Sequence, residues 1–361
     1  MYTIALGFLI LFLFIYIVLN LPVFGKLPQK ERLRRIKNLA TYADGEIKNL
    51  SLTPTKPADI SYFQILAKVL RGNEKGTPPQ ALPHIVPDLT ASDGFKMTWF
   101  GHSSYLLQVE GKNILVDPVF SKRTSPFQFL GTKRFEGTDF IQPEDFPAID
   151  LLILTHDHYD HLDYSSILKF KAKTTHFLTS LGVGAHLQSW AIPSHQFTEL
   201  AWGESASPIA NISFTAVPAR HFSGRRFKRN QSLWSSFVMQ TKNNRIFIGG
   251  DSGYDYHFKE IGEKYGPFDL ALLECGQYNT MWPLIHMFPE QVVQAAIDLK
   301  AAALMPVHWG KFRLALHDWD DPIKRVVAKS EQLGIVLATP MLGESFYLNT
   351  MLPSKKWWLD L

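Results

Sequence analysis

The nine residues Thr155-His156-Asp157-His158-Tyr159-Asp160-His161-Leu162-Asp163 decide the fold, and they directly follow four apolar residues. The apolar run reads as a buried strand, so the polar residues lie in the loop at its carboxyl end. In such a loop His156 and His158 can bind one metal ion, while Asp160 and His161 face a second. The alternative is an exposed polar turn that is histidine-rich by chance, which gives no reason for the HxHxDH spacing. The sequence therefore predicts a metal site here.

Three further candidate ligands each follow an apolar segment that reads as a strand. They are His221, Asp251 and His308. Open α/β sheets gather their chemistry at the carboxyl ends of strands. A lone histidine after a strand is usually structural, but three such residues after HxHxDH complete a ligand set. The predicted metal ligands are His156, His158, Asp160, His161, His221, Asp251 and His308.

From Lys96 onward, short strand-like runs alternate with helical periodicity, which is typical of an α/β fold. The expected strands are 96–100, 104–109, 112–116, 151–155, 212–217, 234–240, 245–248, 270–273 and 303–307. The expected helices are 165–170, 183–190, 289–299 and 322–333. The proline-rich stretch 50–93 reads as a connecting arm with a short helix near 60–70.

The amino terminus is apolar from Ile4 to Leu21 and carries no charged side chain there. At about 1.5 Å per residue this run spans roughly 27 Å, close to the hydrocarbon thickness of a bilayer. No basic region precedes it and no small-residue cleavage site follows it, so a transmembrane helix is expected rather than a signal peptide or an interfacial helix. Because the first positive charges follow the run, we expect a single-pass membrane protein with its catalytic domain in the cytoplasm.

The net charge of +4 is concentrated in one segment. Six basic side chains and one acidic side chain between Lys26 and Lys37 give +5, so the rest of the chain carries about −1. Such a near-neutral remainder argues against a nucleic-acid partner. The basic segment is expected either to meet anionic lipid headgroups or to act only as a topology signal. The single cysteine, Cys275, excludes an intrachain disulfide and a thiolate metal cluster.

Several stretches outside the HxHxDH motif carry a family resemblance. They are Trp99-Phe100-Gly101-His102-Ser103, Leu115-Val116-Asp117-Pro118-Val119-Phe120-Ser121, Gly131-Thr132-Lys133-Arg134-Phe135, Pro218-Ala219-Arg220-His221, Gly249-Gly250-Asp251-Ser252-Gly253-Tyr254 and Val307-His308-Trp309-Gly310. With them the sequence from Met97 to Tyr347 resembles the metallo-β-lactamase superfamily, in its branch of N-acylphosphatidylethanolamine-hydrolysing phospholipase D. HxHxDH alone marks the superfamily, and these stretches mark the branch. The chain departs from the branch at Ile285, where the family has a glutamine, and in the loop 276–282.

The resemblance implies an αββα metallo-β-lactamase sandwich with two zinc ions on one edge. By position, the first zinc would be held by His156, His158 and His221, the second by Asp160, His161 and His308, and Asp251 would bridge them. Together with the composition of the amino-terminal part, the expected organisation is a transmembrane anchor (1–25), a basic juxtamembrane segment and proline-rich arm (26–95), the hydrolase domain (96–350) and a C-terminal tail (351–361). In the tail, Trp357 and Trp358 either pack on the domain or form an interfacial anchor beside two lysines.

Two zinc ions can share a water and lower its pKa toward neutrality, so the expected nucleophile is a metal-bridging hydroxide. The resemblance implies a phosphodiesterase that acts on N-acylphosphatidylethanolamine-like lipids. The predicted catalytic residues are Asp160, Asp251 and His286. His286 would orient the phosphate or assist the leaving group, unless it merely packs at the start of a helix.

Three residues are expected around the ligands rather than among them. His102 would support a metal-bound carboxylate or play a structural part. Asp117 would bond backbone near the metal loop, and Asp163 would do similar work.

Other functions stay open at this stage. A lactonase or other ester hydrolase would use the same hydroxide against a carbonyl, and iron or manganese could replace zinc. A nuclease is disfavoured by the near-neutral catalytic portion. A non-catalytic, membrane-tethered envelope factor would keep metals only for its fold, which the complete ligand set argues against. The expected partners are a phospholipid-like substrate and a membrane, and a homodimer is left open.

Overall fold

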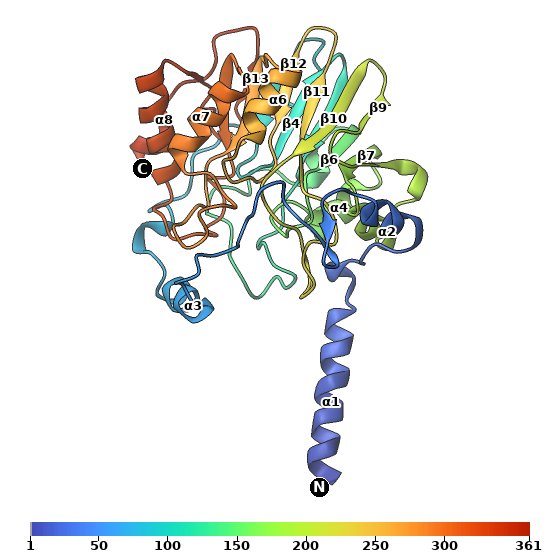
Figure 1. Ribbon diagram of the computed structural model, residues 1–361. Helices are drawn as coiled ribbons and strands as arrows, with labels where there is room; N and C mark the ends of the chain where they lie inside the picture. Colours follow the sequence, from blue (N-terminus) through green and yellow to red (C-terminus); the bar gives the residue numbers. More distant parts are fainter. Residues whose placement is uncertain (1) are drawn as a thin grey trace.

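Two seven-stranded mixed sheets form the centre of the protein (Figure 1). The structure is a computed structural model that describes residues 2–361, with the backbone alone for residues 2–5. In spatial order the first sheet contains β16 (Ser345–Tyr347), β3 (Lys96–Trp99), β4 (Tyr105–Val109), β5 (Lys112–Val116), β6 (Ile149–Leu154), β7 (Thr174–Ser180) and β8 (Phe197–Leu200). The second sheet contains β15 (Val336–Leu337), β14 (Ala303–Val307), β13 (Leu270–Glu274), β12 (Arg245–Ile248), β11 (Ser235–Gln240), β10 (Ile212–Pro218) and β9 (Ser205–Ile209).

Helices cover the outer faces of both sheets. The first sheet carries α4 (Tyr164–Phe170) and α5 (Gly184–Ser189), and the second carries α6 (His257–Tyr265), α7 (Pro289–Asp298) and α8 (Asp321–Leu333). The amino-terminal part contains α1 (Tyr2–Leu19), α2 (Lys30–Lys37), β1 (Tyr42–Ala43), β2 (Glu46–Ile47) and α3 (Tyr62–Arg71). The predicted αββα arrangement is confirmed.

Strand β6 shows how the sequence builds these layers. Successive side chains of a strand point to opposite faces of its sheet. Leu151 and Ile153 lie in the core between the sheets, while Leu152 and Leu154 pack in the cluster beneath α4 and α5. A strand covered on both faces must be apolar at every position, which explains the run before the HxHxDH motif.

Strands β5, β6 and β7 run parallel to one another, as do β12, β13 and β14. Parallel neighbours end at the same edge of their sheet, so the loops that follow them gather there. In both sheets this is the edge from which α1 projects (Figure 1). The topology therefore brings segments that are distant in sequence to one place.

Every expected strand and helix is found, with ends within two residues of the expectation. The expectation missed β7, β8, β9 and α6, among other short elements. The polar end of β7 is buried, because Thr179 and Ser180 donate hydrogen bonds to the Leu154 and Thr155 carbonyls at the end of β6. α6 contains Gly262, whose added Cβ would lie 1.9 Å from the Asp298 carbonyl, so glycine permits the close contact of α6 with α7.

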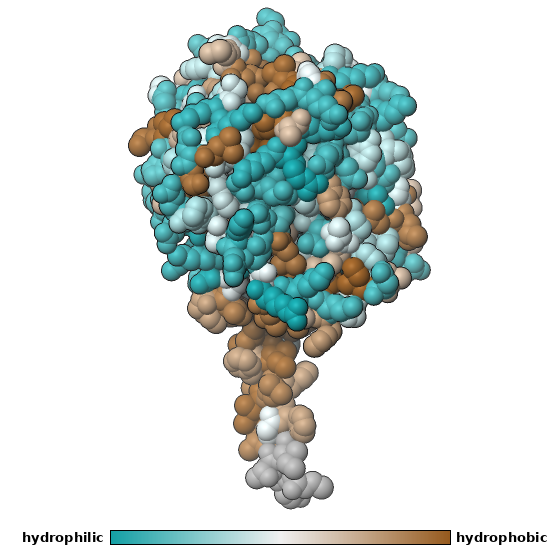
Figure 2. All heavy atoms as spheres, turned by 90° about the vertical axis from the view of Figure 1, so that its left-hand side faces the viewer, coloured by the Kyte–Doolittle hydropathy of each residue, from teal (hydrophilic) through white to brown (hydrophobic). Residues whose placement is uncertain are grey.

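The predicted transmembrane anchor over 1–25 and the single-pass membrane location are wrong. Among the described residues, no helix combines the length and apolarity that crossing a bilayer requires. The apolar run is divided: α1 ends at Leu19, and Phe24, in a 3₁₀ turn, is buried against the domain. Figure 2 shows α1 projecting from the body of the protein with its apolar side chains exposed. The prediction that the catalytic domain lies in the cytoplasm depended on this anchor and is therefore no longer supported.

Two arginines of the basic segment 26–37 form ion pairs with glutamates of the folded domain. Arg32 Nε lies 2.6 Å from a Glu199 carboxylate oxygen, and Arg35 Nη2 lies 2.8 Å from Glu204. Ile36 of the same helix, α2, is buried. These contacts dock α2 on the domain and use part of the positive charge that the sequence concentrates here.

The C-terminal tail packs into the core between the sheets and their helices. Trp357 and Trp358 are buried, and their rings lie 5.3 and 5.7 Å from the ring of Trp309. The interfacial-anchor interpretation of this tail is therefore wrong. Since Trp309 directly follows the candidate ligand His308, the tail supports one corner of the predicted site.

Replacing Trp357 by alanine should lower the free energy of unfolding by about 3–5 kcal/mol, because it empties a large buried volume. Urea denaturation measures this change. Leu359→Ala in the same 3₁₀ turn is the matched control: Leu359 is 56% exposed, so a change within about 0.5 kcal/mol is expected. Equal effects of the two substitutions would contradict the packing described for the tail.

Candidate metal centre

Asp117, in the turn after β5, fixes the start of the HxHxDH loop. Its carboxylate accepts hydrogen bonds from the Thr155 amide (2.9 Å), the Thr155 hydroxyl (2.6 Å) and His161 Nδ1 (2.7 Å). The backbone of Asp117 is left-handed, with φ 38°, a conformation that residues with a side chain rarely adopt. The expected bond to backbone near the loop is confirmed, and the same carboxylate also orients an imidazole.

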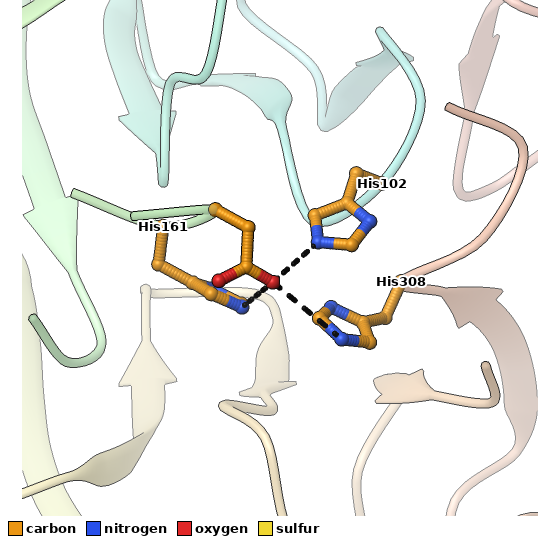
Figure 3. A group of neighbouring side chains, drawn as sticks. His102, His161 and His308 are labelled. Carbon is orange, nitrogen blue, oxygen red and sulfur yellow. Dashed lines mark hydrogen bonds and ion pairs between the residues drawn. The ribbon is translucent and has the colours of Figure 1, made fainter. Parts of the chain in front are cut away.

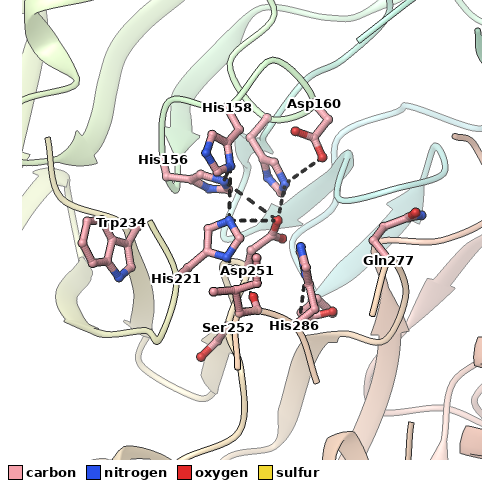
Figure 4. Close-up of polar contacts among 12 residues, drawn as sticks. His156, His158, Asp160, His221, Trp234, Asp251, Ser252, Gln277 and His286 are labelled. Atoms are coloured by element: carbon pink, nitrogen blue, oxygen red, sulfur yellow. Dashed lines mark hydrogen bonds and ion pairs between the residues drawn. The ribbon is translucent and has the colours of Figure 1, made fainter. Parts of the chain in front are cut away.

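His156, His158 and His221 form a first group of converging side chains (Figure 4). His158 Nδ1 lies 2.9 Å from His156 Nε2 and 3.2 Å from His221 Nε2. The other nitrogen of His221 donates to the Ile285 carbonyl at 2.8 Å, which turns Nε2 toward the other two rings. The family resemblance implied that these three histidines hold one metal ion, and the structure brings them together.

Asp160, His161 and His308 form a second group, joined by His102 (Figure 3). One Asp160 oxygen lies 2.9 Å from His102 Nε2, 3.6 Å from His161 Nε2 and 3.9 Å from His308 Nε2. The expected hydrogen bond from His102 to a candidate ligand carboxylate is therefore present.

Reciprocal backbone hydrogen bonds join the turns that carry His102 and His308. The His102 amide donates to the Trp309 carbonyl (2.8 Å), and the His308 amide donates to the His102 carbonyl (3.0 Å). Both histidines have left-handed backbones, with φ 54° and 66°. Strained backbone of this kind persists where surrounding structure fixes it, and it often marks functional sites. Here the two backbone hydrogen bonds hold His102, which follows a strand of the first sheet, next to His308, which follows a strand of the second sheet.

Asp251 lies between the two groups (Figure 4). Its Oδ2 is 3.1 Å from His161 Nε2, 3.8 Å from His221 Nε2 and 3.9 Å from His156 Nε2. Its Oδ1 is 3.2 Å from His308 Nδ1. The carboxylate thus faces members of both groups, as a bridging ligand would.

Burial sets the protonation of the cluster. It is the main cause that lowers the pKa of His156, His221 and His308, so these imidazoles are neutral, the form that binds metal. Burial acts the same way on His161, but three facing carboxylates raise its pKa above the ordinary value. Burial alone would raise the pKa of Asp251, yet the His161 charge lowers it to about 2.

The donor set fits divalent cations. Three buried atoms of the cluster, His102 Nδ1, His308 Nε2 and Asp251 Oδ1, have no hydrogen-bond partner among the described residues. Buried polar atoms are nearly always satisfied, and a bound ion is one recognised way to satisfy them. Imidazole nitrogens and carboxylate oxygens are the ligands that zinc and related metals take.

His286 lies beside Asp251 and His221, and its Nδ1 is 3.4 Å from Glu274 Oε1 (Figure 4). Burial raises the pKa of Glu274 to about 7, although the nearby His286 works against this. Sequence reasoning missed Glu274. It is the last residue of β13, so the rule that found Asp251 and His308, a polar residue ending an apolar strand, would have found it too.

Comparison with known proteins identifies the family. The family model described as "Beta-lactamase superfamily domain" matches residues 112–309, more than half of the chain. The chain belongs to the metallo-β-lactamase superfamily. An uncharacterized protein of Mycobacterium tuberculosis is 39% identical over 324 residues, covering 88% of this chain and 87% of the relative. An N-acyl-phosphatidylethanolamine-hydrolyzing phospholipase D of Caenorhabditis elegans is 32% identical over 265 residues, covering 68% of this chain and 73% of the relative.

The fold of this superfamily also appears in the solved structure of Igni18, a metallo hydrolase from Ignicoccus hospitalis. It is 21% identical, covers 70% of this chain and 97% of the other, and has a TM-score of 0.53. This likeness supports the fold alone. Together the comparisons confirm the resemblance to the superfamily and to its phospholipase D-like branch, and they place the chain among metal-dependent hydrolases.

Two other acidic residues of the stretch 155–163, Asp157 and Asp163, lie outside the cluster. Asp163 begins α4 and accepts hydrogen bonds from Ser121 and Ser166, so it shapes the loop without contacting a candidate ligand. Asp157 accepts from the Gly224 amide (2.7 Å) and lies 3.2 Å from His186 Nε2. It therefore points away from the metal-ligand candidates on either side of it.

Asp117→Asn should weaken metal binding by about 10- to 100-fold, because the amide no longer holds His161 through a charged acceptor. Competition with a chromophoric chelator measures the affinity. Asp150→Asn, which loses bonds to Lys112 and the Asn113 amide far from the cluster, is the control and should bind metal normally. Unchanged affinity in Asp117→Asn would show that this carboxylate does not support the centre.

Proposed function

We propose that the chain is a zinc-dependent phosphodiesterase of the phospholipase D type that acts on N-acylphosphatidylethanolamine-like lipids. The position of Asp251 between two groups of ligand atoms supports it most directly, because this arrangement suits a pair of cations. The relative that hydrolyses N-acyl-phosphatidylethanolamine supports the substrate class.

In this proposal each group holds one zinc ion. His156, His158 and His221 would hold the first, Asp160, His161 and His308 would hold the second, and Asp251 would contribute to both. When bound, such a pair lowers the pKa of water toward neutrality and offsets the charge of phosphate oxygens. The chain's own part is to hold the ligands at fixed positions in a buried site.

His286 is the proposed contact to the substrate phosphate or to its leaving group. It lies beside Asp251 without belonging to either three-residue group, and a Glu274 carboxylate oxygen faces its Nδ1 at 3.4 Å. Imidazole can donate a proton to a departing oxygen at neutral pH. Asp160 and Asp251 act through their carboxylates at the centre itself.

The metal-loaded protein should hydrolyse N-acylphosphatidylethanolamine, releasing phosphatidic acid and an N-acylethanolamine, because the water attacks phosphorus rather than a carbonyl. Mass spectrometry of the products measures this. A parallel panel of lactones, carboxylic esters and oligonucleotides should give much slower turnover. Faster turnover of lactones than of phosphodiesters would contradict the proposal and favour an ester hydrolase, and no turnover of any substrate would favour a non-catalytic role.

His286→Gln should lower kcat by about 100-fold or more while the metal content stays unchanged, because it removes a proton donor and no metal ligand. Steady-state kinetics and elemental analysis measure the two quantities. The exposed His195 provides the control substitution, His195→Gln, which should leave both unchanged. Loss of metal together with activity would instead make His286 a ligand.

A further inference from the structure

A cavity of about 490 Å³ opens beside the candidate metal centre, with His158 and Asp160 in its wall. Its size falls within the range of small-molecule binding sites. Leu19 and Phe24, from the amino-terminal segment, lie in the same wall. Residues far from the superfamily motifs therefore take part in shaping the space next to the centre.

Most of this wall is apolar. Besides Leu19 and Phe24 it contains Phe222, Phe227 and Leu314. The Phe227 side chain is 88% exposed. Exposing an apolar ring to water is unfavourable, and contact with an apolar ligand would remove this exposure. The cavity thus offers a hydrocarbon chain a place to lie with its polar end at the centre.

Positive charge lines the cavity as well. Arg226 and Arg229 are both in the wall. Arg226 donates to the Gly25 carbonyl (2.6 Å), and the Arg229 guanidinium lies 5.0 Å from the centre of the Phe222 ring. These arginines bind a carbonyl and an aromatic ring rather than a carboxylate, so their charge complements an anionic ligand.

Four polar side chains clamp the segment that follows α1. Trp190 Nε1 donates to the Pro22 carbonyl (2.7 Å) and Arg225 Nη2 to the Val23 carbonyl (2.8 Å). Arg226 holds the next carbonyls, and the Lys26 amide donates to His186 Nδ1 (3.1 Å). A Cβ on Gly25 would lie 1.9 Å from that same nitrogen, so only glycine allows this approach.

Two of these four side chains also contact the HxHxDH loop. His186 Nε2 lies 3.2 Å from Asp157, and Arg225 Nη1 donates to the Asp157 carbonyl (3.0 Å) and the Leu162 carbonyl (2.6 Å). Two of the four side chains that hold residues 22–26, His186 and Arg225, therefore also contact the HxHxDH loop near its two ends. Residues 22–26 are therefore held by hydrogen bonds at the wall of the cavity.

We propose that residues 19–25 are part of the substrate-binding site, and that the cavity they close binds one acyl chain of an anionic amphiphile whose phosphate lies at the metal centre. The lipid nature of this ligand rests on the proposed function, whereas the place of the chain rests on the cavity and the clamp. The site then selects for chain length through Leu19 and Phe24.

The test uses alkylphosphonates of increasing chain length, from butyl to dodecyl, which are not hydrolysed. Calorimetry on the metal-loaded full chain should show affinity rising by up to about fourfold for each methylene that the cavity buries. Leu19→Gln and Phe24→Ala should flatten this dependence while the affinity for the shortest phosphonate stays unchanged. Leu13→Gln, in the same helix, 54% exposed and outside the cavity wall, is the matched control and should keep the full dependence.

Two outcomes would overturn the inference: affinity independent of chain length in the unaltered protein, or an equal dependence in Leu19→Gln and Leu13→Gln. Leu19 is only half-buried, so its substitution leaves the core intact if Phe24→Ala perturbs folding. Turnover of the water-soluble diester bis(4-nitrophenyl) phosphate separates the two proposals. Its absence would count against the phosphodiesterase, while the phosphonate series still decides the acyl-chain site.

Discussion

The Asp251 carboxylate, in the loop after β12 of the second sheet, is buried among imidazoles from both sheets, and the site depends on this contact. Its two oxygens lie 3.1 Å from His161 Nε2 and 3.2 Å from His308 Nδ1. Removing a carboxylate from water costs several kcal/mol unless opposite charge compensates it. The two sheets can therefore meet at this edge because a protonated imidazole or bound cations face Asp251.

Separate supports hold the groups around that contact. Asp117 fixes the start of the HxHxDH loop, and reciprocal backbone bonds fix His102 against His308. Asp157 lies within the HxHxDH motif, but its carboxylate ties the loop to the amino-terminal segment through His186, whose other ring nitrogen accepts from the Lys26 amide. The segment before the domain and the metal loop thus form one hydrogen-bonded unit, which is why we assign that segment a part in binding.

Strand and helix periodicity predicted an α/β fold, and the family resemblance implied the αββα layers. Polar residues after apolar strands predicted that the candidate ligands converge, because such patterns are local signals. The sequence-based predictions failed where burial depends on segments that are distant in the chain. Hydropathy alone could not show that the apolar run is divided between α1 and the buried Phe24. Nor could it show that Thr179 and Ser180 of β7 are buried, since the carbonyls that accept their hydrogen bonds belong to a segment about 25 residues earlier in the chain.

The number of metal ions that the folded chain binds tests the central claim most directly. Calorimetric titration of the chelator-treated, full-length protein with Zn²⁺ gives this number. The account predicts saturation at two ions per chain, since two groups of ligands share Asp251. Saturation at one ion or none, in protein that is folded by circular dichroism, would contradict it.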